Sequence, residues 1–303
     1  MGGPYDILAV GYACIDYIAV VDRLPELDEK LIVDNLLIQG GGPAGTAMVA
    51  AARLGLRTGL IAALCRDPLG KQIIDELERE RVDVSLAPIH DQGRAAFAFV
   101  MIQKGTGLRT LVGRRSYLPL LTPDDVRLGE VRRAKALLID GNEPEAQLAA
   151  ARTARKAGVP VIFDAGNEKP GMKELIPFTD ILVASRGFGR DVGGSDDPAT
   201  AAEHFFRSGC LQVAAVTAGA DGAYFCSGEG AFHQPAFAID AADTTGAGDA
   251  FHGGYAYAMV HEWPVRKAAR FAAAVAAIKC TKIGGRTGLP CLREVEEFLA
   301  ENT

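Results

Sequence analysis

The sequence predicts an α/β fold in which helices flank a central, mostly parallel β-sheet and a small β-sheet forms a lid. Short apolar runs alternate with helix-like stretches over most of the chain, as in βαβ units. Residues 84–113 interrupt this alternation, because strand-like segments and turns follow one another there without a helix. The 303 residues are 49% hydrophobic, which is enough for one large core. We therefore expect a single domain over residues 1–303, with a lid formed by about residues 16–40 and 84–115.

The N-terminal third is expected to contain four strands and two helices. Apolar runs predict strands at residues 6–11, 17–21, 31–38 and 58–64. Helix-forming and amphipathic patterns predict helices at residues 44–54 and 67–82. Pro43 suits the first position of the first helix and Gly55 suits its end. The segments in 84–113 are expected to form an antiparallel sheet together with the strands near 17–21 and 31–38.

The α/β alternation returns at residue 135 and continues to the C-terminus. Strands are expected at residues 135–140, 159–165, 180–185 and 213–219. Helices are expected at residues 145–158, 199–209, 247–261, 264–281 and 293–301. Ligands of such sheets bind at the carboxyl ends of the strands. A lid over that edge would exclude water from a reaction.

The composition argues against nucleic acid and membranes as partners. The formal net charge is −6, whereas nucleic-acid-binding domains carry clustered positive charge. No segment reaches the roughly 18 apolar residues of a membrane helix, and "MGGPYDILAVGY" lacks the basic start of a signal peptide. The six cysteines form no C-x-x-C pair, so we expect reduced, mostly buried thiols and a cytoplasmic protein.

Residues 243–254, "DTTGAGDAFHGG", combine a glycine-rich loop, a helix start and a carboxylate. Small residues let the backbone N–H groups of Gly246, Ala247 and Gly248 point outward, and the helix start favours an anion there. These amides could stabilise a transferring phosphoryl group, while Asp249 accepts the proton of an attacking hydroxyl. The helix terminus should keep Asp249 ionised and therefore weakly basic. The alternative is an acidic residue that only complements the helix dipole.

This stretch resembles the second signature of the ribokinase-like (PfkB) family of carbohydrate kinases. "GGGPAGTAMVAAARLG" at residues 40–55 is similar to the first signature, and "VTAGADGA" at 216–223 and "KIGGRTGLP" at 282–290 follow in family order. The resemblance covers the whole chain. It implies a ribokinase-like fold and transfer of the γ-phosphoryl group of ATP, with Mg²⁺, to a hydroxymethyl hydroxyl of a sugar. We also expect a homodimer that forms through the lid.

The resemblance also implies roles for individual residues. Asp249 would be the catalytic base, and Gly246, Ala247 and Gly248 the anion hole. The sugar would contact Asp16, Gly41, Gly42 and Thr46, the last of which replaces the usual Asn. The nucleotide pocket would involve Ser185, Thr217, Gly219, Gly222 and Gly248. Many members bind a monovalent cation, and K⁺ would here be held by Asp243, Thr245, Gly284 and Gly288.

Two departures from the family pattern concern the magnesium ion and the sugar. "SRGF" at residues 185–188 stands where the family has the Asn-x-x-Glu that organises magnesium waters, so no magnesium residues are named. "GGGPAGTA" and the "KCT…GGRTG" segment resemble the sulfofructose kinase branch, and Lys30 in the lid fits it. The branch's polar lid Asn and sulfonate-facing Arg fall on Gly113 and Asn142 here, so a different substrate is expected.

Arg114 and Arg115 in "LVGRRSY" indicate an anionic substrate. Neighbouring strand residues point to opposite faces, so at most one of them should face the sugar. A guanidinium suits a carboxylate, phosphate or sulfonate, and Lys30 could add a second charge. An anionic ketose or a sugar acid is therefore one candidate substrate. In the alternative, both arginines are solvated charges on an edge strand.

Other functions remain open at this stage. A nucleoside or phosphosugar kinase of the same fold would share the signatures. "GGGPAG" matches G-x-G-x-x-G with Asp67 about 20 residues on, the fingerprint of an NAD-dependent oxidoreductase, although Asp34 and Asn35 interrupt the strand before it. The missing Asn-x-x-Glu allows a catalytically silent binding protein. His252 could shuttle protons, but packing within its helix is the simpler role.

Overall fold

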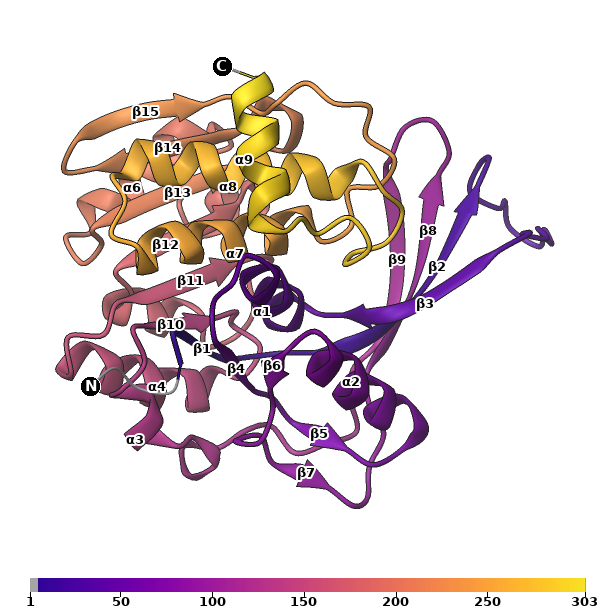
Figure 1. The fold of residues 1–303 in the computed structure, drawn as a ribbon, viewed down its shortest axis with the longest axis horizontal. Coiled ribbons are helices and arrows are strands. Elements are labelled where there is room, and N and C mark those ends of the chain that lie inside the picture. The colour runs from indigo at the N-terminus through magenta and orange to yellow at the C-terminus, as the bar shows by residue number, and fades with distance from the viewer. Residues whose placement is uncertain (1–4, 303) are drawn as a thin grey trace.

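The structure is a computed structural model that describes residues 5–302 (Figure 1). Its large sheet has nine strands in the order β15-β14-β13-β12-β11-β10-β1-β4-β6. Only β14 and β15 run antiparallel to their neighbours. The bounds are β1 Ile7–Val10, β4 Thr58–Ile61, β6 Val82–Asp83, β10 Ala136–Ile139, β11 Val161–Ala165, β12 Ile181–Ser185, β13 Val213–Thr217, β14 Ala223–Ser227 and β15 Gly230–Gln234. The predicted α/β architecture is confirmed.

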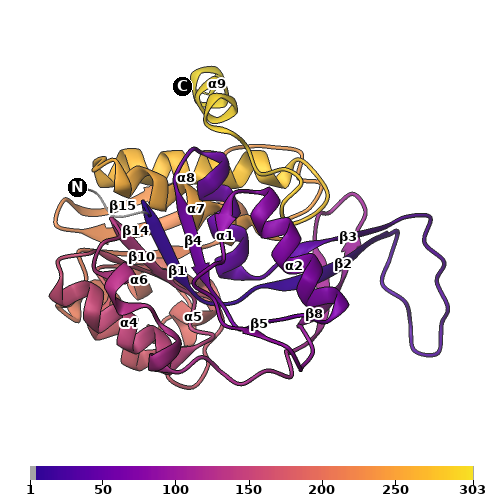
Figure 2. The same cartoon turned by 60° about the horizontal axis from the view of Figure 1, so that its bottom comes forward.

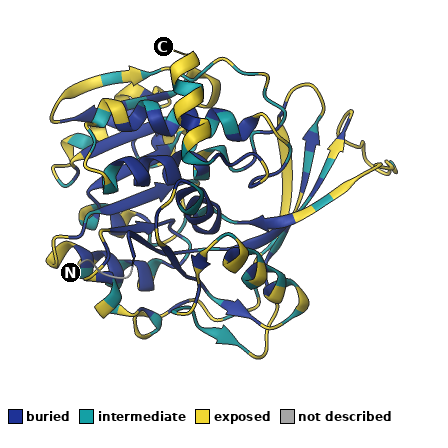
Figure 3. Ribbon diagram, in the orientation of Figure 1, coloured by how far each residue is buried: buried dark blue, intermediate teal, exposed yellow. Residues whose placement is uncertain are grey.

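Helices cover both faces of this sheet and form two cores. Along β1, Ile7 and Ala9 belong to one core, whereas Leu8 and Val10 belong to the other, because alternate strand residues point to opposite faces. The first core is covered by α1 Pro43–Arg53, α2 Pro68–Arg79, α7 Ala247–Val260, α8 Val265–Cys280 and α9 Leu292–Glu301. The second is covered by α3 Leu128–Val131, α4 Pro144–Lys156, α5 Arg186–Asp191 and α6 Pro198–Arg207. Figure 3 shows the strands between them as buried.

A separate four-stranded sheet extends from one side of the large sheet (Figure 1). Its order is β3-β2-β8-β9, with β2 Cys14–Val21, β3 Leu36–Gly41, β8 Phe97–Gln103 and β9 Arg109–Arg114. A short pair, β5 Leu64–Cys65 and β7 Ile89–His90, lies elsewhere. The expected purely antiparallel sheet is wrong, since β2 and β8 are parallel. Several elements from β3 to β7 lie between β2 and β8 in the chain, so no hairpin connects these two strands.

The strand predicted at residues 31–38 instead spans Leu36–Gly41. Its register pairs Cys14 with Gly41 and Asp16 with Gln39, so glycines beyond the predicted end at residue 38 complete the strand. A Cβ atom on Gly41 would lie 2.1 Å from Oδ2 of Asp16, and only glycine lets this carboxylate approach the strand. The run at 58–64 divides into β4 and β5, and the sequence-based prediction did not include β14 or β15.

The helices begin and end close to their predicted positions because their capping residues are clear in the sequence. Pro43 is the first residue of α1, and Asp67 caps α2 by accepting the amide of Gly70 at 2.7 Å. The N-terminus of α7 lies near the carboxyl ends of the parallel strands, where Asp140 follows β10 and Asp164 lies in the last two residues of β11. None of the helices between residues 5 and 302 combines the length and apolar character that a membrane span needs.

Candidate active site

The start of α7 presents free backbone amides to the site. Gly246 has a left-handed backbone (φ 74°), and a Cβ atom there would lie 2.8 Å from the carbonyl oxygen of Gly285. The amide of Ala247, expected in the anion hole, donates to the carbonyl of Thr244 at 3.2 Å. Among residues 5–302, no backbone carbonyl accepts the amides of Gly248 or Asp249. The free donors at the helix start therefore include the amide of Asp249 itself.

The carboxyl group of Asp249 has a raised pKa. Burial is the main cause, and the negative charge of Asp164 adds to it. His252 and Arg109 act in the opposite direction, and Asp16 raises the pKa further. The expectation that the helix terminus alone would keep this group ionised and weakly basic is wrong. A raised pKa makes Asp249 a stronger base at neutral pH.

His252 and Asp164 lie beneath the start of α7. Nδ1 of His252 is 2.7 Å from the carbonyl oxygen of Gly248 and 3.4 Å from Oδ2 of Asp164, while Nε2 is 3.3 Å from the carbonyl oxygen of Val183. Burial lowers the pKa of His252 and raises that of Asp164. Oδ2 of Asp164 is buried without a hydrogen-bond partner among the described residues. These contacts fit a packed helix histidine, and sequence reasoning did not single out Asp164.

Asp16 provides a second carboxylate near Asp249. It is buried against Gly41, its Oδ1 accepts a hydrogen bond from the thiol of Cys14 at 3.4 Å, and burial raises its pKa. Gly42 has φ 86°, and a Cβ atom there would lie 2.7 Å from the carbonyl oxygen of Tyr12. Because the backbone at Gly41 and Gly42 packs so closely against Asp16 and Tyr12, the carboxylate of Asp16 is the group that can accept a hydrogen bond from a ligand here.

Asp140 connects three elements below the site. Its carboxylate accepts the amides of Tyr12 at 2.8 Å, Ala44 at 3.3 Å and Asn142 at 3.0 Å, as well as Nε2 of Gln147 at 2.9 Å. Tyr12 follows β1, Ala44 lies in α1 and Gln147 in α4, whereas Asn142 follows β10 as Asp140 itself does. Since all four bonds are internal, Asp140 holds the strand ends together, and the sequence analysis did not identify it.

Two cations lie near Asn142. Nζ of Lys169 donates to Oδ1 of Asn142 at 2.7 Å. Burial lowers the pKa of Lys169, the charges of Asp140 and Asp164 raise it, and the positive charge of Arg115 lowers it, so Arg115 lies within electrostatic reach of this amine. Arg115 also acts on the pKa of Tyr12, beside Asp140. Lys169, missed in the sequence, thus supplies a positive charge next to the position where the sulfofructose branch has an arginine.

Of three residues expected at the sugar, two contact other parts of the protein and one is exposed in a loop. Arg114 donates to the carbonyl of Ala95 at 2.8 Å and lies 4.7 Å from the ring centre of Phe97, so its guanidinium is bound within the small sheet. Lys30 is exposed in the loop between β2 and β3, which projects away from the large sheet (Figure 2). Thr46 is buried, with Oγ1 3.4 Å from Nε of Arg286. The structure does not bring Arg114, Lys30 or Thr46 to the sugar position.

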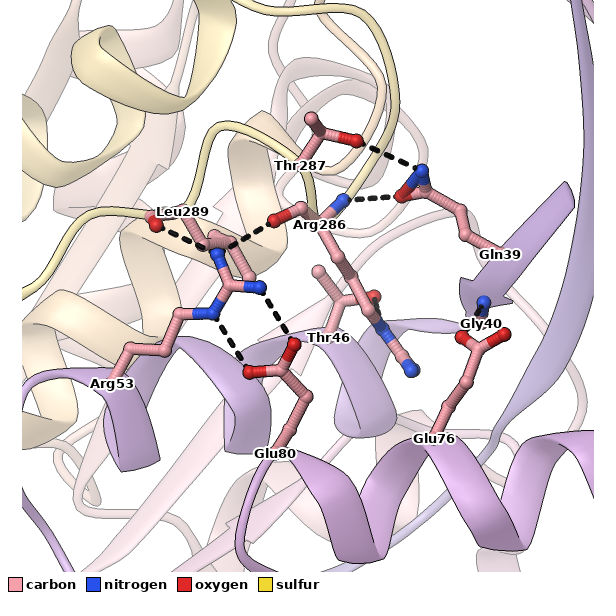
Figure 4. Close-up of polar contacts among 9 residues, drawn as sticks. All are labelled: Gln39, Gly40, Thr46, Arg53, Glu76, Glu80, Arg286, Thr287 and Leu289. Carbon is pink, nitrogen blue, oxygen red and sulfur yellow. Dashed lines mark hydrogen bonds and ion pairs between the residues drawn. The ribbon is translucent and has the colours of Figure 1, made fainter. Parts of the chain in front are cut away.

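Arg286 fastens the C-terminal segment to the small sheet (Figure 4). Its guanidinium donates to the carbonyl of Gly41 at 3.0 Å, and its amide donates to Oε1 of Gln39 at 2.7 Å. The neighbouring Arg53 pairs with Glu80 at 2.7 Å and donates to the carbonyls of Arg286 and Leu289 at 3.0 and 2.9 Å. The C-terminal segment thereby holds strand β3, which carries the glycines beside Asp16, through hydrogen bonds from Arg286.

A cavity of about 480 Å³ opens onto the start of α7. Thr217, Gly219 and Gly222 line it together with Ala247 and Gly248. Its apolar wall consists of Phe237, Ile239, Phe251, Ala273, Ala276 and Ala277. Ser185 does not line this cavity, because its hydroxyl donates to the carbonyl of Gly166 at 2.8 Å and caps α5.

The residues expected to hold K⁺ contain a lysine amine instead. Nζ of Lys279 donates to the carbonyl of Asp243 at 2.8 Å. The carboxylate of Asp243 accepts the amides of Thr245 at 2.7 Å and Gly284 at 2.8 Å. A Cβ atom on Gly288 would lie 2.3 Å from the carbonyl oxygen of Lys279, so this glycine packs against α8. Each oxygen of Asp243 accepts one donor from the protein, whereas Oγ1 of Thr245 is buried without a hydrogen-bond partner among the described residues. A lysine ammonium group therefore already supplies a positive charge where the expected K⁺ would lie.

The β8–β9 hairpin contacts the loop before α7. Arg109 donates to the carbonyl and hydroxyl oxygens of Thr244 at 3.2 and 3.0 Å, and the carbonyl of Gly107 accepts the amide of Thr244 at 3.3 Å. The charge of Arg109 also lowers the pKa of Asp249. Sequence reasoning considered Arg114 and Arg115 in this strand and missed Arg109, whose basic character was the only available signal.

Known proteins resemble this chain over nearly its whole length. The chain matches the model of the pfkB family of carbohydrate kinases over residues 5–291. It is similar to an ATP-dependent ribose-1-phosphate kinase of Halopiger xanaduensis, with 29% identity over 299 residues, 97% of this chain and 98% of that protein. A 5-dehydro-2-deoxygluconokinase of Geobacillus kaustophilus is 29% identical over 324 residues, 99% and 95% of the two chains. The structure of Arabidopsis thaliana ribokinase complexed with ribose and ATP matches with a TM-score of 0.83, 25% identity and 99% of each chain.

These findings decide between the classes of protein that the sequence left open. The G-x-G-x-x-G match lies at the end of β3 in the small sheet, and the dinucleotide-binding alternative is wrong. Among residues 5–302, no three His, Cys, Asp or Glu side chains gather as metal ligands. The relatives named above support the family and leave the sulfofructose branch a prediction. The chain belongs to the pfkB family of carbohydrate kinases and has the ribokinase-like fold.

Proposed function

We propose that this carbohydrate kinase transfers the γ-phosphoryl group of ATP to a hydroxymethyl hydroxyl of a sugar that carries an anionic group. The observation that supports this most directly is the start of α7, where Asp249, with its raised pKa, adjoins the unengaged amides of Gly248 and Asp249. The nucleotide would lie in the cavity lined by Thr217, Gly219 and Gly222. The apolar wall of that cavity suits a base, and its open end meets the same amides.

The proposed reaction needs one base and one anion site. The carboxylate of Asp249 accepts the proton of the sugar hydroxyl while that oxygen bonds to the γ-phosphorus of ATP, and the bond from phosphorus to the bridging β,γ-oxygen breaks to release ADP. The free amides at the helix start stabilise the charge on the transferring group. Asp16 accepts a hydrogen bond from another sugar hydroxyl and fixes the orientation of the ring.

Magnesium would enter with the nucleotide. Mg²⁺ is usually bound through substrate phosphates, a few carboxylates and waters, and when bound it neutralises charge on the phosphates. The "SRGF" sequence at residues 185–188 offers no Asn-x-x-Glu pair to organise its waters. No side chain of this protein is assigned to the ion.

The anionic group is inferred from Lys169 and Arg115. Lys169 is partly buried beside Asn142, and Arg115 lies within electrostatic reach of it. Two cations without a carboxylate ion pair among the described residues favour a carboxylate or phosphate on the ligand. A 5-dehydro-2-deoxygluconokinase and a ribose-1-phosphate kinase are among the relatives, and both names denote anionic substrates.

A matched panel of sugars would test this proposal. Each neutral sugar is paired with its acid or phosphate form, and ADP release is measured with ATP and Mg²⁺. We expect turnover with at least one anionic member at a higher kcat/KM than its neutral partner. If only a neutral sugar or a nucleoside is phosphorylated, the anionic assignment is wrong, and if no member releases ADP, the kinase assignment fails.

The role of Asp249 can be tested with the substrate so found. Asp249→Asn keeps the shape of the side chain but removes the base, so kcat should fall at least about 100-fold while ATP affinity changes little. Asp240→Asn is a matched control, because Asp240 is exposed outside the helix. Retention of more than about a tenth of the wild-type kcat by Asp249→Asn would exclude this carboxylate as the base.

A further inference from the structure

Lys279 is a fully buried amine at the end of α8. None of its surface is exposed, and Nζ donates to the main-chain carbonyl of Asp243 at 2.8 Å. Lysine is almost never fully buried unless its ammonium group is paired, because desolvation of the charge is costly. The partner at this position is the first residue of the "DTTGAGD" loop.

Asp243 needs a nearby positive charge. It is also fully buried, and its two carboxylate oxygens accept the amides of Thr245 and Gly284 at 2.7 and 2.8 Å. Among the described residues, no Lys or Arg forms an ion pair with this carboxylate within 4.0 Å. The charge of Asp243 acts on the pKa of Lys279, and the ammonium group, which donates to the main-chain carbonyl of the same residue, supplies the compensating charge.

This arrangement joins two loops at the catalytic helix. Asp243 begins the loop that ends at Asp249, and the amide of Gly284 belongs to the segment that follows α8. Gly246, the left-handed residue before α7, lies against Gly285 in that segment. The contact between Lys279 and Asp243 therefore fixes both sides of the turn that presents the free amides.

We propose that the ammonium group of Lys279 replaces a bound monovalent cation in this kinase, so that the loop at residues 243–249 keeps its working geometry without K⁺. Lys279 is a positioning residue, because it acts through Asp243 and touches no reacting atom. The expected effect on kcat rests on the proposed function, whereas the expected effect on the melting temperature does not.

The first experiment compares salts on the unmodified protein. Activity is measured in KCl and in tetramethylammonium chloride at equal ionic strength, since tetramethylammonium is too bulky for a small oxygen-lined site. We expect equal kcat in both salts. Stimulation by K⁺ of several-fold would overturn the proposal.

Two substitutions separate charge from packing. Lys279→Ala removes the amine and leaves a cavity beside the carbonyl of Asp243, whereas Lys279→Met fills the same space without charge. In tetramethylammonium chloride both variants should lose about 10-fold or more in kcat. KCl should restore much of the loss in Lys279→Ala and none in Lys279→Met. Lys282→Ala, at an exposed lysine three residues on, should behave as wild type in both salts.

The melting temperature gives a readout that needs no sugar. KCl should raise the melting temperature of Lys279→Ala relative to tetramethylammonium chloride, while wild type, Lys279→Met and Lys282→Ala show no such difference. Without any kinase activity, this pattern would still support the lysine inference and count only against the proposed function. Full activity of Lys279→Ala in tetramethylammonium chloride, or equal melting temperatures of that variant in both salts, would refute it. If Lys279→Ala does not fold in either salt, the wild-type comparison still decides.

Discussion

Four charged or titratable neighbours act on the pKa of Asp249. Asp164 and Asp16 raise it, whereas His252 and Arg109 lower it. Because Asp249 must be ionised to accept a proton, kcat should fall as the pH drops through its pKa. The position of that acidic limb therefore reports on the neighbours, which titrate together with the base.

Opposite shifts of this limb are expected from two substitutions. Asp164→Asn removes a negative charge, lowers the pKa of Asp249 and should move the acidic limb of the pH–kcat profile to lower pH. Arg109→Gln removes a positive charge, raises that pKa and should move the limb to higher pH. Profiles that shift in the same direction, or not at all, would show that a different group governs the limb.

Arg115 and Arg114 form a natural pair for testing the anionic substrate. Arg115→Ala should raise KM for the anionic sugar about 10-fold or more, since a hydrogen bond to a charged group contributes about 1.5–3 kcal/mol. Its KM for ATP should not change. Arg114→Ala is the control, because its guanidinium is bound to the carbonyl of Ala95 and faces Phe97. An equal rise in both variants, or in neither, would remove Arg115 from the sugar site.

Single residues differ in how well the sequence predicts them. Asp249 and Gly246 belong to one contiguous motif. Because the backbone amides of that motif form the anion site, the sequence alone predicts that the two residues lie together. Lys169 and Lys279 depend on contacts with Asn142 and Asp243, which are 27 and 36 positions away. No local sequence pattern predicts such a contact, because the two residues meet only when the sheet has formed.

Secondary structure elements were predictable where their own residues cap them. Helices α1 and α2 begin at a proline, and α7 follows a glycine with positive φ. Strand β3 was misplaced because its glycines look like a loop until Asp16 and Arg286 are brought against them. Strand β15 lies at the edge of the sheet, where exposed and half-exposed residues give a weak apolar signal, whereas β14 beside it is mostly buried but only five residues long.

The attachment of β3 to the C-terminal segment should be important for stability. Arg286 is buried and donates to the carbonyl of Gly41, so Arg286→Met leaves that acceptor without its charged partner. We expect the free energy of unfolding in urea to fall by about 1.5–3 kcal/mol. Arg293→Met, on the exposed side of α9, should change it by less than about 0.5 kcal/mol. A similar small change in Arg286→Met would show that β3 is held by other contacts.

The two faces of the small sheet carry different kinds of side chain. One face carries Asp16 and Arg109 toward the site, and Ile18, Val100 and Ile102 form a small core beside them. The opposite face carries a cross-strand row of Ile38, Tyr17, Phe99 and Val112. Figure 3 shows much of β3 and β9 as exposed. Apolar rows of this kind usually mark an interface in a soluble protein.

A second copy of the chain is the occupant we expect on this face, because a sheet face with a self-complementary apolar row suits a two-fold interface. Ile38, Phe99 and Val112 are 41%, 50% and 62% exposed in the single chain. Sedimentation at micromolar concentration should therefore show a dimer, and Phe99→Glu should convert it to a monomer by placing a charge in the centre of the row. Leu120→Glu, at a leucine outside the sheet that is 63% exposed, should remain dimeric. A monomeric wild-type protein, or a dimer that survives Phe99→Glu unchanged, would mean that the row is covered in another way.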